Sequence, residues 1–320
     1  MNDASASSAK QLPGPSLEER LIPFNGALTL LDPHEHDLPT PLADAGYRTL
    51  RIGVKVSTEK GPTEIDVLAG TDDRTALLAL ECKGGVSVSN RQGQRYAALA
   101  WDDVVRDAGL DVPDGVSGGR VDVMYVAHDG NGPTVQARIE DKSSVPDFPV
   151  IEIGKRQVRL LGRPENTNLV FQDCDVTMAW PRWMTVDAEA DSEDYLDALA
   201  AEVIGLMRGA RGEADGSHVM AFDHLYRSLV PAYDYLVPGV RRTVSHKINV
   251  AARALEHYAP HFFMVTVTET GQSGLAILKT PEDLKLQGRT QQWQSLKRLL
   301  EDVEADEDPQ QSLFISGEDE

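Results

Sequence analysis

The sequence predicts an α/β protein with a mixed central sheet flanked by helices, followed by a mainly helical C-terminal domain that contains a β-hairpin. Two observations predict this architecture. In the first half of the 320-residue chain, segments with the periods of strands and helices follow in the order strand, strand, strand, helix, strand, helix, strand. Beyond about residue 165 helical patterns prevail, apart from two alternating apolar segments on either side of the turn sequence TGQSG.

The N-terminal region contains one helix and leads into the first strand. Ser16 is a good N-cap residue and acids follow it in the first turn, so we expect a helix over 16–31. Three prolines between 33 and 41 interrupt helical structure, except for a turn near 41–46. Residues 47–57 alternate between apolar and polar side chains and are expected to form a strand.

Two further strands and a helix follow. The segments EIDVLAG (64–70) and TALLALECK (75–83), joined by the turn sequence TDDR, extend the first strand into a three-stranded meander. After Gly84 the pattern changes period, and residues 90–109 place apolar side chains on one helical face. The sheet connection is therefore expected to pass through a single helix at this point.

The remainder of the first half completes the sheet. Residues 121–128 form a continuous apolar run, which is typical of a strand covered on both faces. A short helix over 134–141 and a strand over 149–154 follow. We expect four segments in all: a disordered N-terminal tail (1–16), an α/β domain (17–163), a helical accessory domain (164–300) and an acidic, disordered tail (301–320).

Three charged residues stand in the otherwise apolar hairpin. Glu81 and Lys83 are two apart in one strand and project to the same face. With a turn near residue 73, Asp66 lies opposite Glu81 or one position away, about 5 Å between Cβ atoms for a direct pair. Two such close carboxylates repel unless a proton or a cation intervenes. Hard cations such as Mg²⁺ bind to one or two carboxylates, so the cluster suits metal-assisted hydrolysis of a phosphodiester.

The pattern Asp66…Glu81-Cys82-Lys83, on a hairpin followed by a helix, resembles the PD-(D/E)xK nuclease superfamily, in particular its Mrr-like and RecB/Cas4-like members. The resemblance covers roughly residues 40–155 and implies a restriction-endonuclease-like fold. It also implies that Asp66, Glu81 and the backbone carbonyl of Cys82 hold Mg²⁺, for which Mn²⁺ can substitute, and that Lys83 assists the attacking water. The family's proline does not adjoin Asp66, since Pro62 comes four residues earlier.

The following helix carries a second similarity. Gln92 and Tyr96 match the QxxxY of RecB/Cas4-like members and share a helical face, with Gln94 as the competing polar residue. The resemblance implies that these side chains position the substrate. The family also places an acid on its first helix, and the candidates for it are Glu18, Glu19 and Glu35.

The C-terminal domain contains a predicted helix with basic residues. We expect these residues to meet nucleic acid: Arg241, Arg242, Lys247 and Arg253. With the hairpin around TGQSG, this helix resembles the recognition helix and wing of a winged-helix module. The alternative is an ordinary amphipathic helix and hairpin that complete a helical domain.

The acidic tail contains a short apolar segment. Gln310, Ser312, Leu313 and Phe314 resemble the peptide by which bacterial proteins dock on the replication sliding clamp. An apolar pair in a solvated tail buries nothing within its own domain, and this favours a partner.

Composition and charge exclude several other classes. The net charge is −20, so any site for a polyanion must be a local basic patch or use metal ions. No apolar run is long enough to span a membrane, and the polar N-terminus resembles no export signal, so we expect a cytoplasmic protein. Cys82 and Cys174 have no metal-ligand spacing and are expected to be reduced.

These observations predict a Mg²⁺-dependent deoxyribonuclease, with a role in restriction, defence or DNA repair implied by the resemblance. A catalytically inactive DNA-binding or interaction subunit of the same fold is the alternative. The sequence leaves open whether the substrate is DNA or RNA, whether cleavage is internal or terminal, and whether the protein forms a homodimer.

Overall fold

The computed structural model describes residues 15–32, 38, 40–141, 146–162, 173–176, 180–209, 218–258, 260, 263–268 and 271–278. The chain divides into two compact units. The first contains Met1–Arg48 and Lys55–Trp180, and the second contains Thr49–Val54 and Pro181–Glu320. Glu35 and the tail segment with Gln310, Ser312, Leu313 and Phe314 lie outside the described residues.

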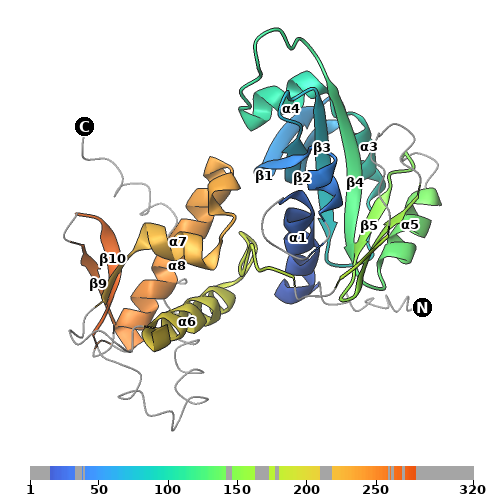
Figure 1. The fold of residues 1–320 in the computed structure, drawn as a ribbon. Helices are drawn as coiled ribbons and strands as arrows, with labels where there is room; N and C mark the ends of the chain where they lie inside the picture. The colour runs from blue at the N-terminus through green and yellow to red at the C-terminus, as the bar shows by residue number, and fades with distance from the viewer. Residues whose placement is uncertain are drawn as a thin grey trace, which may run out of the picture. The chain divides into compact units, whose positions relative to one another are not determined.

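A seven-stranded mixed sheet forms the centre of the first unit, with Thr49–Val54 of its first strand grouped with the second unit (Figure 1). Its strands follow one another in chain order: β1 (Arg48–Thr58), β2 (Gly61–Gly70), β3 (Ala76–Lys83), β4 (Arg120–His128), β5 (Val150–Ile153), β6 (Gln157–Leu161) and β7 (Cys174–Asp175). The β2–β3 pair is antiparallel, whereas β3, β4 and β5 are mutually parallel. The predicted mixed α/β architecture is confirmed. Because β3, β4 and β5 are parallel, their C-terminal ends lie at the same edge of the sheet.

Helices cover both faces of this sheet: α1 (Leu17–Leu31), α2 (Pro41–Asp44), α3 (Asn90–Ala97), α4 (Trp101–Ala108) and α5 (Gly132–Glu140). Alternate residues of β5 identify the two faces. Ile153 meets α1 at Gly26, whereas Val150 packs in a core cluster with Val135 and Ile139 of α5. The predicted N-cap of α1 is present, since Ser16 and Glu19 form a capping box.

Two details of the sequence prediction for this unit need correction. The single helix expected over 90–109 is two helices, α3 and α4, separated at 98–100. The second begins at Trp101, whose indole N–H donates to the main-chain oxygen of Arg74 in the β2–β3 turn and thereby fixes a new helix direction. The first unit also extends to Trp180 rather than 163, because the short strands β6 and β7 continue the sheet.

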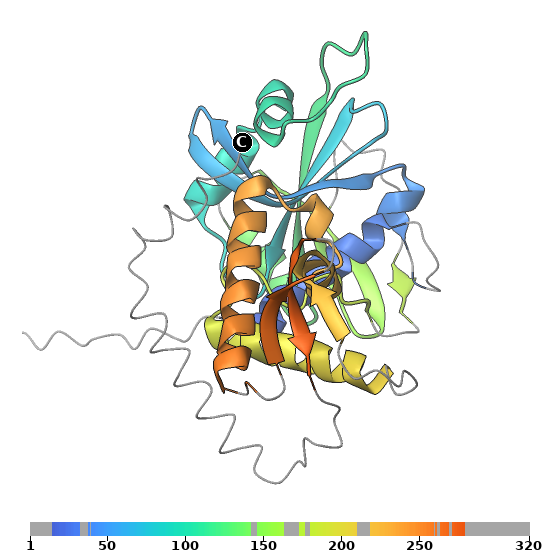
Figure 2. The ribbon, with the colours of Figure 1, turned by 90° about the vertical axis from the view of Figure 1, so that its left-hand side faces the viewer.

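The second unit contains three main helices and a small sheet. Its elements are α6 (Ser192–Gly209), β8 (His218–Ala221), α7 (Phe222–Leu229), a 3₁₀ turn (Tyr233–Tyr235), α8 (Pro238–Tyr258), β9 (Phe263–Val267) and β10 (Ser273–Ile277). Helix α8 packs on α6, α7 and β9, and Figure 2 shows it beside the β9–β10 hairpin. The sequence predicts the hairpin, but β8 is an addition that pairs with β10 and gives the strand order β8-β10-β9.

Among the described residues, no helix has the length and apolar character needed to cross a membrane.

A close helix–sheet contact yields a testable expectation. A Cβ atom at Gly26 of α1 would lie 2.7 Å from a side-chain carbon of Ile153, closer than packed atoms approach. We expect Gly26→Ala to lower the free energy of unfolding by about 1–3 kcal/mol through overpacking, measured by urea denaturation. The matched control is Gly239→Ala in α8, where a Cβ meets nothing within 4 Å. Equal effects of the two substitutions would contradict this explanation.

Candidate active site

The charged hairpin opens where β2 and β3 stop pairing. Their ladder runs from Gly70 opposite Leu77 to Val67 opposite Leu80. Continuing this register places Asp66 opposite Glu81, the first of the two arrangements expected from the sequence, so both carboxylates lie on one face of the sheet. At that point the amide N–H of Cys82 donates to Oδ2 of Asp66 at 2.7 Å. The carboxylate thus accepts the hydrogen bond that a main-chain oxygen of β2 would accept in a regular ladder.

Glu81 lies at the centre of a compact cluster. Its Oε1 accepts from Nζ of Lys83 at 2.6 Å and from Nε2 of Gln92 at 2.7 Å, and its Oε2 lies 2.5 Å from the hydroxyl of Tyr96. The Lys83 ammonium also donates to Oε1 of Gln92 at 3.0 Å. The side chains of Glu81 and Lys83 are only 7% and 14% exposed. The low exposure strengthens these charge-assisted hydrogen bonds.

Helix α3 delivers Gln92 and Tyr96 together because they are one turn apart. The side chain of Ser89 caps this helix by accepting from the backbone N–H of Gln92. Gln94 is exposed and forms no hydrogen bond within the described part of the chain. Of the two candidate glutamines, the structure therefore brings only Gln92 into the cluster.

Two further groups hold the cluster in place, and the sequence did not indicate them. The Tyr96 hydroxyl lies 2.6 Å from the main-chain oxygen of Glu64 as well as beside Glu81, so its one hydrogen is shared between two acceptors. Tyr125 of β4 packs edge-on against Tyr96, and the Lys83 ammonium lies 5.6 Å from its ring centre. The parallel pairing of Glu81 with Tyr125 produces this contact.

Burial of the cluster shifts the affinity of its groups for protons. Desolvation, followed by the negative charge of Glu81, raises the pKa of Asp66 well above its usual value. Desolvation and the two carboxylates also raise the pKa of the Cys82 thiol and of the Tyr96 hydroxyl. Asp66 consequently favours a proton or a cation next to it.

The donor set matches a hard divalent cation that keeps waters or substrate oxygens as its other ligands. Asp66 and Glu81 supply two carboxylates. Because the amide of Cys82 points toward Asp66, its carbonyl in the same extended residue points the same way. The side chain of Cys82 points to the opposite face of β3 from Glu81 and Lys83, so its sulfur is not among these donors. In the described residues no three His, Cys, Asp or Glu side chains form a complete metal-binding group.

The first-helix acids are not part of this cluster. The carboxylate of Glu19 is used by the N-terminal capping box of α1, which lowers its pKa. Glu18 lines a separate pocket on the α1 side of the sheet. The sequence left the choice among these acids and Glu35 open, and no acid of α1 makes a hydrogen bond or ion pair with the cluster in the described residues.

The basic residues of α8 separate into two pairs. Arg241 donates to the main-chain oxygens of Asp234 and Leu236, and Lys247 donates to those of Ala188 and Ala190. These two side chains stabilise the second unit and are not available to a ligand.

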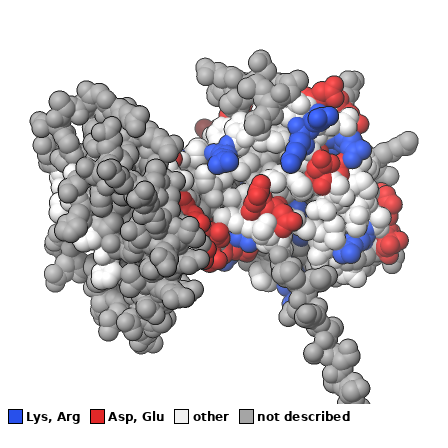
Figure 3. Space-filling model, turned by 90° about the horizontal axis from the view of Figure 1, so that it is seen from below, with Lys and Arg blue, Asp and Glu red and all other residues white. Residues whose placement is uncertain are grey.

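Arg242 and Arg253 are exposed instead, and neither forms an ion pair within the described ranges. His246 lies one turn after Arg242, on the same side of the helix. Among the described residues visible in Figure 3, acidic and basic side chains lie next to one another.

Comparison of the chain with family models, curated proteins and solved structures gives no match. The resemblance to PD-(D/E)xK nucleases therefore depends on the residues described above.

Proposed function

We propose that the chain is a metal-dependent nuclease that hydrolyses phosphodiester bonds of DNA and has a restriction-endonuclease-like first unit. One observation carries this proposal: Asp66, Glu81, Lys83, Gln92 and Tyr96, from two strands and a helix, converge at the opening between β2 and β3. An ordinary surface ion pair would need neither the buried glutamate nor three separate donors to it.

Each group has a chemical task in this proposal. Asp66, Glu81 and the carbonyl of Cys82 would hold Mg²⁺ or Mn²⁺, which supplies Lewis acidity and lowers the pKa of a bound water. Lys83 stabilises negative charge that develops on the phosphate, because its ammonium is held beside the carboxylates by Gln92. Tyr96 fixes the orientation of Glu81 through its hydroxyl.

Cleavage of labelled DNA in Mg²⁺, in Mn²⁺ and in EDTA tests the proposal directly. We expect cleavage that requires a metal ion and that Lys83→Ala reduces by about 10²–10³-fold. Lys55→Ala removes an exposed lysine of β1 and is the matched control, with unchanged cleavage. Full activity of the Lys83→Ala variant would exclude this mechanism, and RNA in place of DNA determines the substrate class.

A nuclease-fold protein without catalysis is the second candidate. It is favoured by the hydrogen bonds that already engage both oxygens of Glu81, and by the cluster's having no third carboxylate among the described residues. Binding of DNA without cleavage under every metal condition would support it.

We propose further that the second unit is a winged-helix module. Its elements follow the order helix, strand, helix, helix, strand, strand, and β8 lies beside β10. In that arrangement α8 takes the place of the recognition helix, with Arg242 and Arg253 free to contact phosphates. Sliding-clamp binding through the tail and homodimer formation remain predictions from the sequence.

A further inference from the structure

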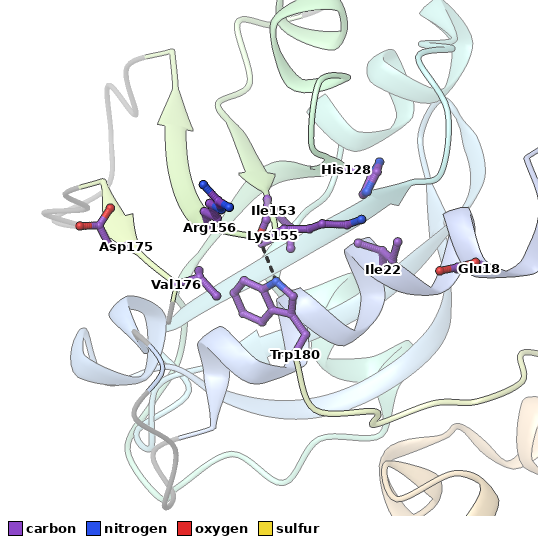
Figure 4. A pocket seen from close by; sticks show the side chains of 10 residues that line it. Glu18, Ile22, His128, Ile153, Lys155, Arg156, Asp175, Val176 and Trp180 are labelled. Atoms are coloured by element: carbon purple, nitrogen blue, oxygen red, sulfur yellow. Dashed lines mark hydrogen bonds between the residues drawn. The ribbon is translucent and has the colours of Figure 1, made fainter. Parts of the chain in front are cut away.

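A second site lies in the first unit, on the side of the sheet that α1 covers. It is an open pocket of about 810 Å³ (Figure 4). Residues of α1, of the ends of β4 and β5, of β7 and of the segments after them line it: Glu18, Ile22, His128, Ile153, Gly154, Lys155, Arg156, Asp175, Val176 and Trp180. Its volume falls in the range of sites for small molecules of roughly 300–1,000 Å³.

The pocket is separate from the carboxylate cluster, although both lie at the same edge of the sheet. Lys83 ends β3 and pairs with Ala127, the residue before His128 at the end of β4. Because successive residues of a strand point to opposite faces, His128 and its partner Ile153 face α1, whereas Lys83 and Glu81 face α3. Neither site therefore needs the other to be complete.

Two cationic side chains line the pocket. Lys155 and Arg156 are exposed, and within the described ranges their side chains form no ion pair or hydrogen bond. In Figure 4 Lys155 extends toward His128 and the α1 side, and Arg156 stands on the other side, above Val176. An anionic group beside Lys155 and His128 would receive hydrogen bonds from ammonium and imidazole donors, and Arg156 adds positive charge on the other side of the pocket.

The floor of the pocket is apolar and contains one fixed aromatic ring. The indole N–H of Trp180 donates to the main-chain oxygen of Gly154 at 3.0 Å, so the ring is held against the β5–β6 turn. Ile22, Ile153 and Val176 add apolar side chains to the lining. A planar heterocycle can stack on such an indole, a contact worth about 1–3 kcal/mol for a nucleobase.

The two carboxylates of the pocket restrict the ligand further. Glu18 and Asp175 lie at opposite ends of the lining in Figure 4 and accept hydrogen bonds only. They disfavour a ligand that carries negative charge along its whole length and suit amino or hydroxyl groups. The ligand therefore combines one anionic group, one planar ring and polar hydrogen-bond donors.

We infer that this pocket binds a phosphorylated nucleoside, with its phosphate at Lys155 and His128, its base against Trp180 and Arg156 as a second positive charge across the pocket. The sugar hydroxyls and the base amino group then face Glu18 and Asp175. Either a free nucleotide or the phosphorylated end of a nucleic acid strand presents this chemistry.

Binding measurements on the full chain in EDTA test the inference. Titration with adenosine 5′-monophosphate, followed by calorimetry, is expected to saturate and to weaken at least tenfold in Lys155→Ala/Arg156→Ala. Adenosine, which lacks the phosphate, and inorganic phosphate, which lacks the nucleoside, are each expected to bind at least tenfold more weakly than the mononucleotide. The double variant Lys55→Ala/Lys60→Ala, which removes two exposed charges of the first unit elsewhere, is the control with unchanged binding.

A second arm identifies the source of the ligand. A short oligonucleotide with a 5′-phosphate is compared with the same strand bearing a 5′-hydroxyl. Saturable binding of the mononucleotide supports the pocket and selects the free form, whereas saturable binding of the phosphorylated strand alone supports it and selects the chain-end form. In either case Lys155→Ala/Arg156→Ala should weaken the binding at least tenfold. No saturable binding of either probe, or binding that Lys155→Ala/Arg156→Ala leaves unchanged, overturns it.

The inference does not rest on the proposed nuclease activity. The same titration in an Asp66→Asn variant is expected to give unchanged binding, because the carboxylate cluster is on the other face of the sheet. A catalytically silent chain with an intact pocket would therefore refute the proposed function alone.

Discussion

Asp66→Asn is expected to abolish DNA cleavage and at the same time to make the folded chain more stable. Cleavage should fall by about 10³-fold or more, because a proposed metal ligand is lost and metal assistance is worth several kcal/mol. Stability should rise by about 1 kcal/mol, or ~2–4 °C in Tm. The neutral amide no longer opposes the charge of Glu81, and its oxygen can still accept from the Cys82 amide.

The stability gain has a defined pH dependence. The folded pKa of Asp66 is raised, so the unfolded chain loses this proton at lower pH than the folded chain does. Below about pH 4, the ordinary aspartate pKa, both states are protonated and wild type and variant should differ little. As the pH rises from there toward the raised folded pKa, the wild type should lose free energy of unfolding relative to Asp66→Asn.

Thermal unfolding between pH 4 and pH 8, in EDTA, measures this difference. Glu59→Gln is the matched control, because this acid lies just after β1, is not among the groups that raise the pKa of Asp66 and has a 75%-exposed side chain. It is expected to change neither cleavage nor the pH profile. A wild type that is more stable than Asp66→Asn at neutral pH would show that the paired carboxylates do not repel each other as described.

Glu152→Ala is expected to cause the largest loss of stability, about 3–5 kcal/mol in the free energy of unfolding. Glu152 is 1% exposed, and its Oε1 accepts from the amides of Gly130 and Gly132, at the start of α5. Its Oε2 accepts from the guanidinium of Arg159 through Nε, at 2.8 Å, and Nη2. Alanine leaves two amides at a helix N-terminus and a guanidinium without their acceptor.

Urea unfolding with a two-state fit measures this loss. Glu59→Ala removes a 75%-exposed glutamate and should change the free energy of unfolding by less than about 0.5 kcal/mol. A loss under about 1 kcal/mol in Glu152→Ala would mean that water replaces the carboxylate at little cost.

The sequence predicted the parts of the fold that long periodic segments specify. Strands β1 to β5 and helix α1 have strong apolar patterns or a capping box, and the structure places them within a few residues of the expected ranges. The strands β6, β7 and β8 were not predicted, because two to five residues carry too little pattern and depend on their neighbours for pairing. The break at 98–100 depends on the distant contact of Trp101 with Arg74.

In the candidate site, as in the fold, the sequence predicted what neighbouring residues determine and not what depends on contacts between distant segments. The alternation of β3 and the hairpin turn were sufficient to place Asp66, Glu81 and Lys83 together. Helical spacing alone kept both Gln92 and Gln94 as candidates, and the choice required the direction of α3 relative to the sheet.

The basic residues of α8 were least predictable. The engagement of Arg241 and Lys247 depends on main-chain oxygens of other segments, which no local pattern reports.

The raised pKa of the Cys82 thiol has a consequence for the chemistry that the cluster tolerates. Alkylating reagents and peroxides attack a thiolate, and burial together with the nearby carboxylates of Asp66 and Glu81 disfavours this form. The residue that separates the two charged side chains of β3 is therefore expected to react with peroxides more slowly than an ordinary free cysteine.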